Sequence, residues 1–200
     1  MPYYHLDNYP QKVKIENIIC LARTYRDHAK EMGAEITPEP LLFLKPTNAV
    51  IFNNQSVVIP KRSKLLHHEV ELGVIMAEKG KNIPKNKALD KVLGYLLAFD
   101  ITARDIQQEA KKHGWPWTLS KGFDTFCPIS KVVLKQEVPE PNKLDLILKV
   151  NGEVRQHSNT KNMICKVEEI IEFVSEIMTF SAVSDNCTHH CTDISVFVRR

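Results

Sequence analysis

The sequence has 200 residues, of which 43% are hydrophobic and 26% charged, so it fits one globular domain with a sizeable core. Its 27 basic and 24 acidic side chains give a net charge of +3, and no basic block occurs, which argues against nucleic-acid binding. No apolar run approaches the roughly 20 residues that a membrane span needs, and five scattered cysteines do not predict a disulfide framework.

The first residues, MPYYHLDNYPQKVK, contain neither an apolar signal core nor an Arg- and Ser-rich transit segment. We therefore expect a soluble interior compartment: the cytoplasm, with the mitochondrion as the alternative.

Strand patterns prevail in the first half of the chain. Four segments combine short apolar runs or partial alternation, and we predict strands there: 15–22, 41–46, 56–60 and 68–76. The charged segment 25–32 between the first two predicts one or two helical turns, which Pro38 stops.

The second half alternates between strand and helix signals. Residues 79–91 predict a loop leading into a short helix, and 93–100 is an apolar run closed by an acid. Residues 102–114 open on Thr-x-x-Asp and end on Gly, which predicts a helix with Thr as its cap. Residues 144–156 predict a hairpin around Asn-Gly, and 167–178 an amphipathic helix. This mixture predicts an α+β fold rather than a doubly wound sheet.

The strongest chemical signal is an acidic cluster in the predicted strands. Glu69 and Glu71 are two positions apart, so on a strand they share one face, about 7 Å apart along it. Asp100 ends an apolar run that would otherwise be buried. Three carboxylates on rigid strands would make an all-oxygen site that suits Mg²⁺, Mn²⁺ or Ca²⁺. The alternative is that the glutamates line a solvated strand face and Asp100 caps a helix.

Two further groups stand out. In the first, which contains Arg23, His28 and Glu31, a helix would place His28 and Glu31 on one side, where a carboxylate makes an imidazole a better general base. In the second, Lys121 lies among turn formers with Gln107 upstream. On spacing alone each is also compatible with ordinary surface charges.

Five motifs occur in one order along the chain: Arg-x-Tyr-x-x-His (23–28), Phe-Leu-Lys-Pro (43–46), His-His-Glu-Val-Glu-Leu-Gly-Val (67–74), Asp-Ile-Thr-Ala-Arg-Asp-Ile-Gln (100–107) and Lys-Gly-Phe-Asp (121–124). Together they resemble the fumarylacetoacetate hydrolase family, especially its small acylpyruvase-like and oxaloacetate-processing members. The resemblance covers 15–179, after an N-terminal extension over 1–14. The family fold it implies is a mixed β-roll, assembled as a homodimer.

The resemblance also implies roles for individual residues. It assigns Glu69, Glu71 and Asp100 to a metal ion, Mg²⁺ first and Mn²⁺ or Ca²⁺ as alternatives. It assigns Lys121 to developing negative charge on the substrate, and Arg23 and Gln107 to substrate binding. It assigns His28 and Glu31 to a pair that activates water.

The implied reaction is metal-dependent hydrolysis of a C–C bond in a small acylpyruvate-type β-keto acid, with oxaloacetate decarboxylation as a related activity. The resemblance stops after Thr179: residues 180–200 lack the Thr-Gly-Thr-Pro loop and following strands of the family, so we expect an incomplete roll with exposed core edges. Two alternatives follow: a catalytically impaired, metal-binding remnant of such an enzyme, or a keto–enol isomerase of oxaloacetate or a catechol-pathway acid.

Overall fold

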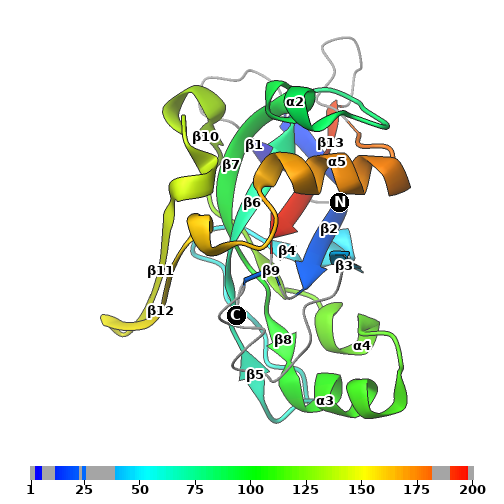
Figure 1. Ribbon diagram of the computed structural model, residues 1–200. Coiled ribbons are helices and arrows are strands. Elements are labelled where there is room, and N and C mark those ends of the chain that lie inside the picture. Colours follow the sequence, from blue (N-terminus) through cyan, green and yellow to red (C-terminus); the bar gives the residue numbers. More distant parts are fainter. Residues whose placement is uncertain (1–2, 6–11, 23, 26–38, 182–189, 198–200) are drawn as a thin grey trace.

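The computed structural model describes residues 3–5, 12–22, 24–25, 39–181 and 190–197, with the backbone alone in 3–5, 12–14 and 190–197 (Figure 1). Within these ranges no helix is both long and apolar enough to cross a membrane. The predicted helical turns over 25–32 lie outside the described residues except for Tyr25, which forms an isolated bridge with Met163.

The main sheet has seven strands in the described part of the chain. Its order is β1 (Tyr3–His5), β2 (Lys12–Ala22), β13 (His190–Phe197), β6 (Val70–Met76), β7 (Val92–Phe99) and β10 (Val133–Leu134), with β3 (Leu41–Lys45) paired to β2. All pairs are antiparallel except β13 with β2, which is parallel. Every residue of β6 is buried, so this strand lies in the core and not on a solvated face.

Short strand pairs and helices complete the fold. The pairs are β4 (Val50–Ile51) with β9 (Cys127–Pro128), β5 (Leu66–His67) with β8 (Thr102–Ala103), and β11 (Asp145–Val150) with β12 (Glu153–Asn159). The α-helices are α2 (Lys85–Ala88), α3 (Arg104–His113), α4 (Thr118–Lys121) and α5 (Val167–Ile177). The 3₁₀ turns are η1 (Thr47–Ala49), η2 (Leu89–Lys91), η3 (Lys135–Glu137), η4 (Pro141–Lys143) and η5 (Thr160–Asn162).

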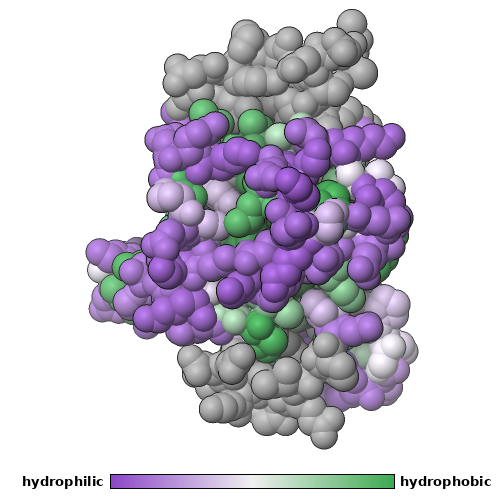
Figure 2. All heavy atoms as spheres, turned by 45° about the horizontal axis from the view of Figure 1, so that its top comes forward, coloured by the Kyte–Doolittle hydropathy of each residue, from purple (hydrophilic) through white to green (hydrophobic). Residues whose placement is uncertain are grey.

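The core has two parts, one on each side of the sheet. Ile170, Ile171 and Val174 of α5 are fully buried against the part that includes Leu72 and Val74 of β6, and Figure 1 shows α5 lying across this face. The other part includes Ile18 and Cys20 of β2 together with Phe126. Helices α3 and α4 lie at the end of the molecule away from α5 (Figure 1). The side near α2 and α5 is mainly hydrophilic, with small separate apolar patches (Figure 2).

Most predicted elements are confirmed, and their ends have clear causes. The hairpin β11–β12 turns at Asn151 and Gly152, whose φ angles of 52° and 86° suit this turn residue pair. Helix α3 ends at Gly114, which is left-handed at φ 67°.

Two local predictions are wrong. Residues 56–60 form no strand, since they have no partner strand; the Val58 amide donates instead to the Thr125 hydroxyl at 2.9 Å. Thr102 does not cap α3, because the N-cap is Ala103. The Thr102 hydroxyl instead accepts a hydrogen bond from the buried Lys121 ammonium.

The chain after Thr179 also differs from the expectation of open sheet edges. Strand β13 lies between β2 and β6, with eight residue pairs to β2 and four to β6. The divergent tail therefore supplies an interior strand of the main sheet, although it carries none of the expected family motif.

Candidate active site

Three acidic residues lie where β6 and β7 run side by side. Glu69 directly precedes β6 and Asp100 directly follows β7, and the Asp100 amide donates to the Glu69 carbonyl at 2.9 Å. Glu71 pairs with Ala98 across the two strands. Their exposed fractions are 3% for Glu69 and 0% for Glu71 and Asp100, so none of the three lies on a solvated face. The alternative of a surface pair is excluded.

Lys121 brings two of these acids together. It is the last residue of α4, and it is only 2% exposed. Its ammonium donates to Asp100 Oδ2 and to the Thr102 hydroxyl, the latter at 2.8 Å, and lies 3.4 Å from Glu69 Oε2. Glu69 and Asp100 therefore share one positive charge, which stands between them.

Arg104 links the cluster to Gln107. From the start of α3 its guanidinium donates to Glu69 Oε1, to the Gln107 amide oxygen, and to His67 Nδ1 at 3.2 Å. The last contact requires that His67 Nδ1 carry no proton, because it accepts. Gln107 is thus held at 3% exposure beside the acids.

Buried acids and buried bases are equal in number here. The acids are Glu69, Glu71 and Asp100, and the bases are Lys45, Arg104 and Lys121. Burial of an unpaired charge is very costly, so each member depends on its partners.

The pKa shifts follow from this pairing. Burial acts to raise the pKa of Asp100, but Lys121 and Lys45 outweigh it and hold that pKa below its ordinary value. Burial also raises the pKa of Glu69, against the opposing effect of Lys121. The pKa of Lys121 is raised, because the nearby acids outweigh its burial. Asp100 and Lys121 therefore form a charged pair.

Two thiols lie buried near these charges. Burial, followed by the charge of Asp100, raises the pKa of Cys20 well above its ordinary value. Burial raises the pKa of Cys127 to about 12. Both remain protonated near neutral pH, so neither is an activated nucleophile.

The predicted metal ligands fit a hard divalent cation by their chemistry. They offer only carboxylate oxygens, and all three residues are buried. Two of them, Glu69 and Asp100, already contact the Lys121 ammonium. As the described side chains lie, no three His, Cys, Asp or Glu groups surround one position. That all three acids bind one ion therefore stays a prediction.

The structure thus brings Glu69, Asp100, Lys121 and Gln107 into one network. Three other predicted residues lie outside the described residues: Arg23, His28 and Glu31. Sequence reasoning assigned no role to Lys45 and Arg104, and it treated Thr102 only as a helix cap. The available signal was a charged residue within an apolar strand pattern, as Lys45 is in LLFLKP.

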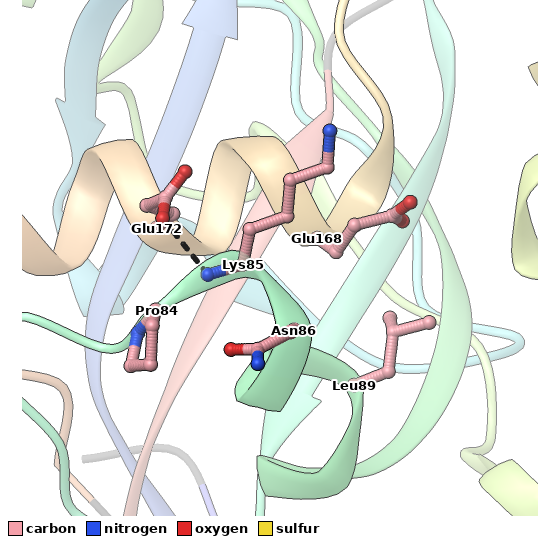
Figure 3. Close-up of a pocket in the computed structure, with 6 residues that line it drawn as sticks. All are labelled: Pro84, Lys85, Asn86, Leu89, Glu168 and Glu172. Atoms are coloured by element: carbon pink, nitrogen blue, oxygen red, sulfur yellow. Dashed lines mark hydrogen bonds between the residues drawn. The ribbon is translucent and has the colours of Figure 1, made fainter.

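Two pockets lie outside this network. One of about 530 Å³ lies beside α2 and α5 (Figure 3) and is lined by Pro84, Lys85, Asn86, Leu89, Glu168 and Glu172. In it the Lys85 amide donates to Glu172 at 2.8 Å. The other, about 280 Å³, lies beside α4 and is lined by Arg62, Ile106, Thr118, Leu119, Gly122 and Phe123. The second pocket borders the segment that carries Lys121.

A family model described as fumarylacetoacetate (FAA) hydrolase C-terminal matches residues 17–184, which contain the entire described network. The chain belongs to the fumarylacetoacetate hydrolase family. Among relatives of this family, an uncharacterised protein of Pyrococcus horikoshii is 51% identical over 84% of this chain and 73% of its own length. Mouse mitochondrial oxaloacetate tautomerase FAHD1 is 49% identical over 82% of this chain and 74% of its own length.

Solved structures of the family share the fold. A family protein from Yersinia pestis has a TM-score of 0.85 at 34% identity, covering 93% of this chain and 82% of its own. Fumarylpyruvate hydrolase from Pseudomonas aeruginosa, in complex with Mn²⁺ and pyruvate, has a TM-score of 0.87 at 27% identity, covering 98% and 83%. The prediction of a fumarylacetoacetate hydrolase-type fold is confirmed.

Proposed function

We propose that this family member interconverts the keto and enol forms of small 2-oxo acids such as oxaloacetate, using a divalent metal ion. The observation that carries the proposal is the buried network in which Glu69 and Asp100 share the Lys121 ammonium. Similarity to the oxaloacetate tautomerase of mouse supports the choice of substrate. The net charge of +3 is compatible with an acidic substrate.

The residues of the chain have distinct parts in this proposal. Glu69, Glu71 and Asp100 would hold the ion, Mg²⁺ or Mn²⁺, which when bound supplies Lewis-acid stabilisation of negative charge. With Glu69 and Asp100 on the ion, the Lys121 ammonium would be able to donate to the oxygen that gains negative charge, and finally the proton, as the keto form becomes the enol. Gln107, oriented by Arg104, offers a second polar group to the substrate. Burial excludes water and strengthens these interactions.

Hydrolysis of a C–C bond in an acylpyruvate-type acid is the second candidate. The similarity to the Mn²⁺- and pyruvate-bound fumarylpyruvate hydrolase favours it. It would need His28 and Glu31 to activate water, whereas tautomerisation would not. We propose a homodimer as the active form for either reaction.

The decay of the oxaloacetate enol, followed by ultraviolet absorbance, tests the proposal. We expect Mg²⁺ to accelerate it, a chelator to abolish the acceleration, and Lys121→Met to lower kcat/KM by about 10²–10³-fold. Lys149→Met, at an exposed position of β11, is the matched control and should behave as the unmodified chain. Activity without metal, or full activity of Lys121→Met, would contradict the proposal. No activity with any metal or acylpyruvate would favour the impaired remnant.

A further inference from the structure

Lys45 has an environment that its position in the sequence does not explain. It ends β3, where its side chain is only 1% exposed. Its ammonium donates to the carbonyl of Ile101 at 3.0 Å and to the carbonyl of Lys121 at 2.7 Å, and it lies 2.8 Å from Asp100 Oδ1. The two carbonyl contacts are hydrogen bonds, and the contact with Asp100 is an ion pair.

The two oxygens of Asp100 are therefore held by two different lysines. Lys45 lies at Oδ1, and Lys121 at Oδ2. Contacts at both oxygens fix the plane of the carboxylate, as a single contact would not. Because Lys45 also binds the main chain of Lys121, it joins the acid and the end of α4 in one unit.

The ring of Phe126 covers the same ammonium, with its centroid 5.8 Å away. Phe126 is fully buried, so the ring shields the ammonium from solvent. Lys45 is placed to act on the site through Asp100 and Lys121, without touching the reacting atoms.

We propose that Lys45 is a positioning residue, which sets the orientation of the Asp100 carboxylate and anchors the Lys121 backbone, and so prepares the site for a cation. The part about the cation rests on the proposed function. The part about the anchor does not, because it follows from contacts within the chain.

If Lys45 acted only through its charge, its removal would change the affinity for the metal in the opposite direction. A positive charge beside a metal ligand repels the metal, so its removal alone should tighten binding. If Lys45 instead orients Asp100, its removal weakens binding, even though the site becomes more negative. The sign of the change therefore separates the two roles.

Calorimetric titration of Mn²⁺ without substrate measures this sign. We expect Lys45→Met to bind Mn²⁺ about 10- to 100-fold more weakly than the unmodified chain, as for other groups that orient metal ligands. The control Lys149→Met removes an exposed lysine and should bind as the unmodified chain does. Equal or tighter binding by Lys45→Met would overturn the proposal.

Amide hydrogen exchange without metal tests the anchor separately. We expect faster exchange in 118–123 of Lys45→Met, because α4 loses its tie to β3, and unchanged exchange in 85–91 around α2. Should this variant fail to fold, Lys45→Gln, which keeps an amide donor but no charge, replaces it in both measurements. Unchanged exchange at α4 would overturn the anchor. If the unmodified chain binds no Mn²⁺, the proposed function fails, while the exchange result still decides on Lys45.

Discussion

Single residues at this site cannot be considered apart from their partners. Asp100 is fully buried, yet its pKa is lowered, because Lys121 and Lys45 outweigh its burial. Removal of one member of such a buried set leaves an uncompensated charge, which costs roughly 3–5 kcal/mol of stability. The residues that would perform the chemistry therefore also contribute to the stability of the fold.

Asp105, beside the network, gives a pH-dependent prediction. Burial opposes its ionisation, but the Lys64 amide and the Ser63 hydroxyl donate to it at 2.8 Å and 2.7 Å and help to lower its pKa. A lowered folded-state pKa contributes stability above the ordinary value, and this stability is lost as pH falls through the lowered pKa. The contribution is about 1 kcal/mol or less, because the carboxylate is partly exposed.

Urea unfolding between about pH 7 and pH 2.5 checks this prediction. We expect Asp105→Asn to lower the unfolding free energy at neutral pH and to make it less sensitive to acid than in the unmodified chain. Asp90→Asn, at an exposed position, serves as control. An acid dependence of Asp105→Asn identical to that of the unmodified chain would show that these hydrogen bonds contribute nothing.

Part of the site could be predicted from sequence. Glu69, Asp100 and Lys121 stood out because strand alternation and motif order marked them. Thr102 was misassigned as a helix cap, since the local pattern Thr-x-x-Asp fits a cap equally well. Its actual partner, Lys121, comes from a helix 19 residues away. No local pattern encodes such a contact.

At the scale of elements, close packing between strands limits the size of the side chain that fits at each position. A Cβ added at Gly94 of β7 would lie 2.4 Å from the Val133 carbonyl oxygen of β10. A Cβ at Gly73 of β6 would meet the end of the Leu96 side chain instead, at 2.3 Å. A side chain can move aside more easily than a paired backbone.

We therefore expect Gly94→Ala to lower the unfolding free energy by about 1–3 kcal/mol, as overpacking does, and Gly73→Ala by less. Thermal and urea unfolding of the two variants measure the difference. The reverse order would mean that Leu96, which is 3% exposed, is more rigid than the β7–β10 pairing.

Elements with a complete local pattern were predicted correctly. The Asn-Gly hairpin and the amphipathic helix α5 need only their own residues to be recognised. The predicted strand over 56–60 failed, because a strand also needs a partner. Val58 and Ile59 have strand-forming side chains, yet they are 62% and 70% exposed.

For the whole molecule, the main finding is the strand from the tail. Strand β13 is the neighbour of both β2 and β6, so the hydrogen bonding of the main sheet runs through residues 190–197. The sequence did not predict this, because the resemblance ends before the tail. The parallel partner β2 lies more than 160 residues away in the chain.

Ser195 provides a test of this arrangement, since it pairs with Ile19 on one side and Val74 on the other. Proline lacks an amide proton and is confined to sheet edges. We expect Ser195→Pro to lower the unfolding free energy by about 3 kcal/mol or more. Ser195→Ala, which changes the side chain but keeps the amide, should cost far less. Equal stability of the two variants would contradict the placement of β13 in the interior of the sheet.

The central claim is that the acids at the start of β6 and the end of β7 bind one divalent ion. Titration of Mn²⁺ followed by electron paramagnetic resonance of the free ion tests it most directly. We predict one ion per chain, with affinity lowered at least about tenfold in Glu69→Gln and in Glu71→Gln. Glu153→Gln, which changes an exposed glutamate, should leave the affinity unchanged. No binding, or equal affinity in all three variants, would contradict the account.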